Sequence, residues 1–167
     1  MDITIRRAEP TEYAALGDLT AAVYLHAGFL DLGEDDPYAD TLRDVPARAI
    51  GADVLVAVRD DDGHLLGGVT YAPPGSRWAD IAGPHEAEFR TLAVDPAARG
   101  QGVGEALVRA CIDRARATPH VENLVLSTQR TMLAAHRMYD RLGFTRTPER
   151  DWAPVPNVSL LTYSLKL

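Results

Sequence analysis

Residues 86–109 read EAEFRTLAVDPAARGQGVGEALVR, and this stretch decides the fold. Its first part, up to Val94, predicts a strand that becomes apolar toward its end. Pro96 then ends the strand because proline has no N–H to donate to a sheet ladder. Three glycines follow at every second position: Gly100, Gly102 and Gly104. Apolar residues at helical spacing come next, so the stretch predicts a strand, a tight turn and a helix.

A strand, a glycine turn and a helix start together form a site for an anion. The first turn of a helix has N–H groups without an intrahelical acceptor, and the helix dipole adds partial positive charge there. Glycines leave those N–H groups open to a phosphate. Arg99 precedes the first glycine and can add a charge-assisted contact. The pattern therefore indicates a diphosphate ligand.

The spacing of the glycines excludes two common phosphate loops. A dinucleotide site needs Gly-x-Gly-x-x-Gly after a first strand, and a nucleoside triphosphate loop needs Gly-Lys-Ser or Gly-Lys-Thr. Here the order is Gly-x-Gly-x-Gly, several elements precede it, and the only lysine of the chain is Lys166. The string RGQGVG after a strand ending Leu-Ala-Val instead resembles the acyl-CoA diphosphate loop of the GNAT superfamily of N-acetyltransferases.

The resemblance implies acetyl-CoA as co-substrate and a set of cofactor-binding residues. In the family, a backbone N–H near the strand end polarises the thioester oxygen, a bulge opens a slot there for the pantetheine arm, and the glycine loop binds the diphosphate. The implied positions here are Leu92, Ala93, Val94, Arg99, Gly100, Gln101, Gly102, Val103 and Gly104.

A second motif lies at residues 135–144, AHRMYDRLGF, and resembles the closing motif of the same family. The pattern predicts an amphipathic helix, a glycine stop and an aromatic strand start. The resemblance makes Tyr139 the proton donor to the departing CoA thiolate, whereas the structural alternative is a half-buried tyrosine with a hydrated hydroxyl. Met132 stands where the family often has a cofactor-binding asparagine, and Thr128, Gln129 or Thr131 could take over that contact.

Two glutamates, Glu86 and Glu88, share one face of the central strand. An amine must lose a proton before it attacks, so the reaction needs a base or a water chain. Glu88 falls four residues before Leu92, where related enzymes often hold a catalytic glutamate. Neighbouring carboxylates can raise each other's pKa toward neutrality. Two alternatives stay open: both are ordinary exposed carboxylates, or Glu86 contacts the ammonium group of the substrate.

The composition describes an ordinary soluble domain. The chain has 167 residues, of which 46% are hydrophobic, and these values favour one domain over residues 1–167. The net charge of −7 argues against nucleic acid as a partner. Cys111 is the only cysteine, and the five histidines have no metal-ligand spacing, so we expect no disulfide and no metal. No signal peptide or membrane-length apolar run is found, which favours the cytoplasm.

The order of the expected elements is β-α-α-β-β-β-α-β-α-β-β, an α/β fold with a central, mostly antiparallel mixed sheet flanked by helices. This order is similar to the GNAT fold. Expected strands cover residues 3–6, 53–58, 65–71, 89–94, 124–126, 144–147 and 158–167. Expected helices cover residues 11–26, 40–50 with a break at Pro46, 103–117 and 131–142. The pair Gly67-Gly68 predicts a bulge or a close backbone approach.

These features predict an N-acetyltransferase that moves the acetyl group of acetyl-CoA to a primary amine of a small molecule or peptide in a ternary complex. The alternatives are an acyl-CoA sensor without transfer activity and an interaction module whose acidic residues 31–40 bind a basic partner. Three segments are expected to line the acceptor side, residues 24–40, 72–84 and 148–156. The last strand could pair across a homodimer.

Overall fold

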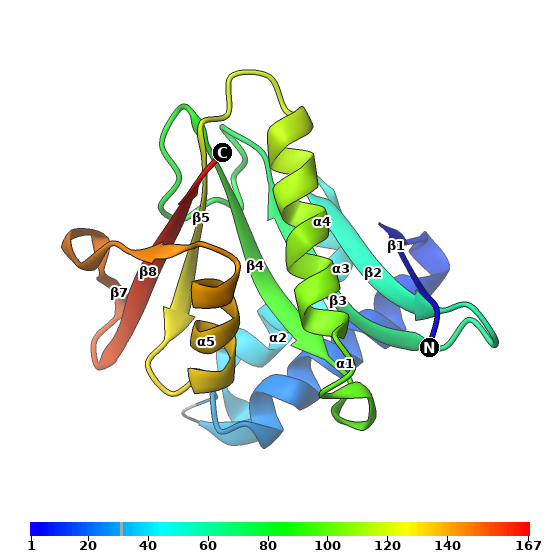
Figure 1. The fold of residues 1–167 in the computed structure, drawn as a ribbon. Coiled ribbons are helices and arrows are strands. Elements are labelled where there is room, and N and C mark those ends of the chain that lie inside the picture. Colours follow the sequence, from blue (N-terminus) through cyan, green and yellow to red (C-terminus); the bar gives the residue numbers. More distant parts are fainter. Residues whose placement is uncertain (31) are drawn as a thin grey trace. The chain divides into compact units, whose positions relative to one another are not determined.

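The computed structural model describes residues 1–30 and 32–167 (Figure 1). Two compact units make up the chain: residues 1–71 with 91–111, and residues 72–90 with 112–167. Strand β4 (Glu86–Val94) and helix α4 (Val103–Ala117) each begin in one unit and end in the other. That residues 1–167 act as one domain stays a prediction.

The first unit is an antiparallel sheet with three helices from the chain's beginning. Its strands follow the order β1-β2-β3-β4, and β2 pairs antiparallel with both β1 and β3. The other strand bounds are β1 (Ile3–Arg7), β2 (Asp53–Arg59) and β3 (Leu65–Ala72). The helices are α1 (Tyr13–His26), α2 (Pro37–Arg43) and α3 (Val45–Ala49), with short 3-10 turns at Pro10–Glu12, Gly33–Asp35 and Pro96–Ala98.

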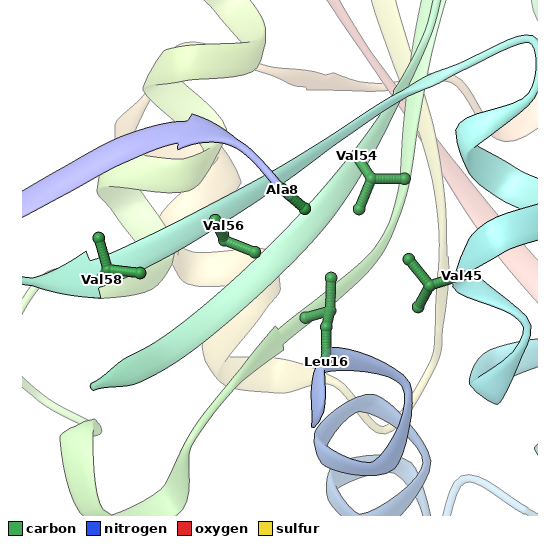
Figure 2. Close-up of a cluster of buried hydrophobic side chains, with 6 residues drawn as sticks. All are labelled: Ala8, Leu16, Val45, Val54, Val56 and Val58. Atoms are coloured by element: carbon green, nitrogen blue, oxygen red, sulfur yellow. The ribbon is translucent and has the colours of Figure 1, made fainter. Parts of the chain in front are cut away.

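Alternating valines of β2 form part of the core of this unit. Val54, Val56 and Val58 point to one face because side chains of a strand alternate between its two faces. They pack with Leu16 of α1 and Val45 of α3, and Ala8 completes the cluster (Figure 2). Burying each valine or leucine contributes about 1.5–3 kcal/mol to the free energy of unfolding, so this cluster fixes α1 and α3 on the sheet.

Gly67 of β3 allows two backbone segments to come close. A Cβ placed there would lie 2.5 Å from the carbonyl oxygen of Ala93 on β4 and 3.3 Å from Leu107 Cδ1. A Cβ placed on the next residue, Gly68, would lie 2.5 Å from Cδ1 of Leu16. The prediction of a close backbone approach at this glycine pair is therefore confirmed.

Replacing Gly67 with alanine should lower the free energy of unfolding by about 1–3 kcal/mol, because the methyl group overlaps a carbonyl oxygen that cannot move freely. Urea unfolding of Gly67→Ala measures this loss. Gly83→Ala is the matched control, since its Cβ meets only the end of Glu86 at 3.6 Å. Equal urea concentrations at the unfolding midpoints of the two variants would show that Gly67 is not required for the close approach to Ala93.

The second unit is built around strand β8 (Val158–Lys166). Its strands follow the order β4-β5-β8-β6, with β7 paired to β8. The parallel pairing joins Glu86–Glu88 of β4 to Asn123–Val125 of β5, whereas β8 pairs antiparallel with β5, β6 and β7. The remaining bounds are β5 (Asn123–Gln129), α5 (Leu133–Arg141), β6 (Thr145–Arg146), the 3-10 turn η4 (Pro148–Arg150) and β7 (Trp152–Val155).

The predicted fold class is confirmed: the sheet is open and mixed, mostly antiparallel, and flanked by helices. Two predicted elements were wrong. The helix expected at residues 40–50 is two helices that begin at Pro37, and they divide at Asp44, which caps α3 by accepting from the N–H of Ala47. The loop expected at residues 148–156 contains strand β7, because Trp152 and Val155 pair with β8.

Candidate active site

The central strand has one residue in an unusual backbone conformation. Thr91 has a φ of 55°, a left-handed value that β-branched residues rarely adopt. Its buried hydroxyl lies 2.7 Å from the hydroxyl of Thr70 on β3, which helps to hold it. The irregular residue directly precedes Leu92, Ala93 and Val94, so it lies beside the place where the bulge was expected. The slot for the pantetheine arm itself stays a prediction.

Asp95 fixes the start of the turn that leads to the glycines. Its N–H donates to the carbonyl of Leu66 at 2.8 Å, and its Oδ1 accepts from the N–H of Ala97 at 3.0 Å. His64 Nε2 lies 3.3 Å from the other carboxylate oxygen. The hydrogen bond from Ala97 and the contact with His64 hold the pKa of Asp95 below its usual range despite partial burial. The loop therefore leaves β4 from an anchored position.

The glycine loop itself is open. Gly100 and Gly102 have φ values of 75° and 81°, which glycine adopts without strain. A Cβ placed on either would have no atom within 4 Å, and Arg99 and Gln101 beside them are exposed. Helix α4 begins directly afterwards at Val103, whose side chain is buried and anchors the first turn. Bare amides at a helix start with one exposed arginine fit a diphosphate.

Glu88 is buried, with 1% of its surface exposed, and it does not act as a free strand carboxylate. Its Oε1 accepts from the N–H groups of Ile81 and Ala82, at 2.8 and 3.1 Å. Burial raises the pKa of Glu88 above its ordinary value, and these backbone hydrogen bonds lower it only in part. A buried carboxylate with a raised pKa has the property that a base near neutral pH requires.

Glu86 lies in a different environment, although it shares the strand. Burial acts to raise its pKa, but the hydrogen bonds from Arg150 and from the N–H of Gly83 outweigh burial, and the pKa lies below its ordinary value. Arg150 binds it with two nitrogens, at 2.7 and 3.0 Å. The prediction that the two glutamates raise each other's pKa was therefore wrong: burial and Asp80 act on Glu88, and Arg150 acts on Glu86.

Tyr139 of α5 is buried, with 4% of its surface exposed, so it is not the half-buried residue of the structural alternative. Its ring centroid lies 5.6–5.9 Å from the rings of Tyr163, Phe144 and Phe89. The aromatic cluster fixes the orientation of the Tyr139 ring. Its role as proton donor stays a prediction.

The region around Met132 is occupied by internal contacts. Met132 lies just before α5, and its sulfur accepts from the buried Thr128 hydroxyl at 3.4 Å. His136 Nε2 lies 3.0 Å from the carbonyl oxygen of Gln129 and 3.3 Å from Thr128 Oγ1. The sequence did not predict these contacts of His136 with Gln129 and Thr128. Thr128 and Met132 stay predicted cofactor-binding residues, while Thr131 is exposed.

The acidic segment contributes to a cavity of about 290 Å³ in the first unit. The cavity is lined by Asp18, Ala21, Ala22, Leu25, Leu30, Glu34, Ala39 and Arg43. Arg43 Nε lies 3.9 Å from Asp18 Oδ1, so the polar rim carries both signs of charge. Asp31, which the sequence placed in this segment, lies outside the described residues.

Comparison with known proteins identifies the family. A sequence model described as the Acetyltransferase (GNAT) family matches residues 21–144, a span that includes the glycine loop and Tyr139. The chain belongs to the GNAT acetyltransferase family. The resemblance of the two motifs to this family is thereby confirmed.

Solved GNAT structures share the fold over nearly the whole chain. The structure of YncA from Salmonella typhimurium with its cofactor acetyl-CoA has a TM-score of 0.73 and 26% identity, and covers 99% of this chain and 94% of that one. A GCN5-related N-acetyltransferase of Kribbella flavida has a TM-score of 0.71 and 25% identity, with 99% and 98% covered.

Curated relatives match over shorter spans. An uncharacterized N-acetyltransferase of Schizosaccharomyces pombe is 33% identical over 105 residues, which are 63% of this chain and 60% of that protein. The mycothiol acetyltransferase of Salinispora arenicola is 36% identical over 98 residues, 57% of this chain and 29% of that protein. This chain therefore spans less than two thirds of the length of these relatives.

Two further observations concern the described residues of this GNAT chain. In residues 1–30 and 32–167, no three His, Cys, Asp or Glu side chains are grouped as a metal site. Within the same residues, none of the helices has the length and apolar character needed to cross a membrane.

The raised pKa of Glu88 predicts a pH-dependent stability difference. Its folded-state pKa exceeds the unfolded value, so the stability that Glu88 contributes is complete below the unfolded pKa and is lost as pH rises through the folded pKa. Relative to Glu88→Gln, the wild type should lose up to about 1.4 kcal/mol of unfolding free energy per pH unit in that interval. Urea unfolding between mildly acidic and neutral pH measures this. Parallel curves for the two proteins would show that burial does not act on Glu88 as argued.

Proposed function

We propose that this chain is an N-acetyltransferase that moves an acetyl group from acetyl-CoA to a primary amine of a small molecule or peptide. The observation that carries the proposal is the open loop at Gly100 and Gly102, which precedes α4 in a chain of the GNAT family. The similarity to YncA, whose structure contains acetyl-CoA, supports the same co-substrate.

The glycine loop binds the diphosphate in this proposal. Backbone N–H groups of residues 100–104 donate to the phosphate oxygens, and Arg99 adds a charged donor. The side chain of Gln101 and the first turn of α4 at Val103 complete this end of the site. Acetyl-CoA supplies the activated thioester, and the N–H groups of residues 92–94 stabilise negative charge on its oxygen. Thr128 and Met132 are further proposed contacts of the cofactor.

Glu88 and Tyr139 handle the protons. The amine nitrogen forms a bond to the acetyl carbon while the carbon–sulfur bond breaks, so transfer is direct and needs both substrates bound together. Glu88 takes the proton that the ammonium group must lose, directly or through water, and its raised pKa supports this role. Tyr139 gives a proton to the departing sulfur. Glu86 is already paired with Arg150, which favours a structural role or a contact at the edge of the acceptor site over proton transfer.

The acceptor side is proposed to be built by residues 24–40, 72–84 and 148–156. We also propose that the enzyme acts as a single domain in the cytoplasm, where acetyl-CoA is available to it.

A panel of primary amines with acetyl-CoA tests the proposal, and release of free CoA thiol is the readout. The expected result is amine-dependent thiol release with at least one amine class. The second candidate function, an acyl-CoA sensor, draws support from Met132 at the usual asparagine position. Tight acetyl-CoA binding by calorimetry without thiol release for any amine would favour that sensor and contradict the enzyme.

A further inference from the structure

Arg150 connects the second unit's η4 turn to the start of β4. Its Nη2 lies 2.7 Å from Glu86 Oε1, and its Nη1 lies 3.0 Å from Glu86 Oε2. A guanidinium that binds a carboxylate with two parallel hydrogen bonds is held in one orientation. In that orientation Nη2 also donates to the carbonyl oxygen of Ile81, at 2.8 Å. Arg150 is half-buried, so water competes for these contacts less than at the surface.

The peptide groups next to this contact bind the other glutamate. The N–H groups of Ile81 and Ala82 both donate to Glu88 Oε1, while the N–H of Gly83 donates to Glu86 Oε1 at 3.0 Å. Three consecutive amides thus donate to the two carboxylates of β4. Ile81 is bound on both sides, by Arg150 through its carbonyl and by Glu88 through its N–H.

We propose that Arg150 is a positioning residue that acts on Glu88 through Ile81, by fixing residues 80–83 over the buried carboxylate. Its consequence for catalysis rests on the proposed function, in which Glu88 accepts the proton of the amine. The arrangement itself consists of contacts within the second unit and does not depend on acetyl-CoA.

The charges around Glu88 determine what loss of Arg150 should do. Asp80, in the segment between β3 and β4, raises the pKa of Glu88, whereas the positive charge of Arg150 favours the carboxylate form. Two further charged residues, Glu86 and Arg90, lie on the same strand as Glu88. Burial is the largest cause of the raised pKa, and backbone hydrogen bonds from residues 80–82 lower it in part. When Arg150 is lost, its positive charge no longer favours the Glu88 carboxylate, and the hydrogen bonds from the loosened residues weaken. The pKa of Glu88 should then rise further above its ordinary value.

Carboxyl-carbon NMR of protein labelled at glutamate tests this on the whole chain without an acceptor. Glu88→Gln assigns the signal. In Arg150→Gln the midpoint of the Glu88 titration should move to higher pH, and hydrogen exchange of the amides of residues 81–83 should rise about tenfold or more. Arg146→Gln is the matched control, because Arg146 binds Asp151 with two nitrogens at 2.8 and 2.7 Å and donates to the carbonyl of Thr162. The control should leave both readouts unchanged.

An unchanged titration and unchanged exchange in Arg150→Gln would overturn the proposal, as would equal changes in the Arg146 control. If Arg150→Gln does not fold, Arg150→Lys replaces it. Lysine keeps the charge but cannot bind Glu86 and Ile81 as a planar fork, so smaller changes in the same directions are expected. No change in the folded lysine variant would count against the proposal.

Kinetics separate this inference from the proposed function. If wild type releases no thiol with any amine of the panel, the proposed function fails, and the NMR result still decides the role of Arg150. If wild type is active, the acid limb of its kcat/KM profile should move with the Glu88 titration in Arg150→Gln, while the KM for acetyl-CoA stays within about twofold. An acid limb that stays in place would overturn the inference alone.

Discussion

Replacing Gly102 with valine is expected to weaken acetyl-CoA binding about 100-fold, the largest effect on the cofactor that a single substitution here should have. A Cβ at this residue points into open space, so the variant has room to fold. The same open space is where the diphosphate must approach the amides at the start of α4. Loss of one or two charge-assisted hydrogen bonds, at about 1.5–3 kcal/mol each, corresponds to a factor of this order. Calorimetric titration measures the Kd.

The substitution also strains the backbone, because Gly102 has a φ of 81°. Gly63→Val is therefore the control, since Gly63 in the β2–β3 turn has a φ of 69° and equally open surroundings. Both variants should lose similar stability, but only Gly102→Val should lose affinity. Wild-type affinity in Gly102→Val would show that the diphosphate does not use this loop.

Replacing Tyr139 with phenylalanine is expected to lower kcat about 100-fold, within the range that general acid catalysis contributes. Phenylalanine keeps the ring contacts with Phe89, Phe144 and Tyr163, so the fold of the second unit and the Kd for acetyl-CoA should change little. The hydroxyl is the only group removed, and a falling kcat at constant Kd points to the chemical step.

Tyr163→Phe is the matched control for this experiment. Tyr163 belongs to the same aromatic cluster, 5.6 Å from Tyr139, and it has no place in the proposed proton transfers. Its variant should keep kcat within about threefold. Equal rates for Tyr139→Phe and wild type, measured by thiol release with an active amine, would remove Tyr139 from the mechanism.

The fold and the glycine loop could be predicted because both depend on local patterns. A short apolar run rich in β-branched residues marks β2, and glycines at every second position before an amphipathic run mark the loop and α4. The close approach at Gly67 likewise follows from glycine chemistry alone. Each of these signals lies within a few residues of the feature that it predicts.

The environments of the two glutamates could not be predicted, because they depend on distant partners. Arg150 lies 64 positions after Glu86 in the chain. Nothing local distinguishes it from other arginines. The hydrogen bonds to Glu88 come from Ile81 and Ala82, in a segment whose composition resembles an ordinary surface loop. The sequence therefore assigned the wrong cause to the pKa shifts of the two glutamates, and the two shifts have opposite directions.

The two wrong elements have a similar explanation. Pro46 suggested the break between the helices, but proline is tolerated in the first turn, so the actual boundary is the capping residue Asp44. Prolines at 148, 154 and 156 suggested a loop after β6. Strand β7 forms nevertheless because, among the described residues, β8 is its one partner, and a strand with a single partner tolerates proline on its other side.

The central claim is that main-chain amides between residues 99 and 104 bind the diphosphate of acetyl-CoA. Titration of nitrogen-15-labelled protein with acetyl-CoA, followed by amide NMR, tests it residue by residue. We expect the largest shifts at the amides of residues 100–104, and the same shifts with CoA, which carries the same diphosphate. Saturating binding that leaves these five amides unshifted while others move would contradict the account.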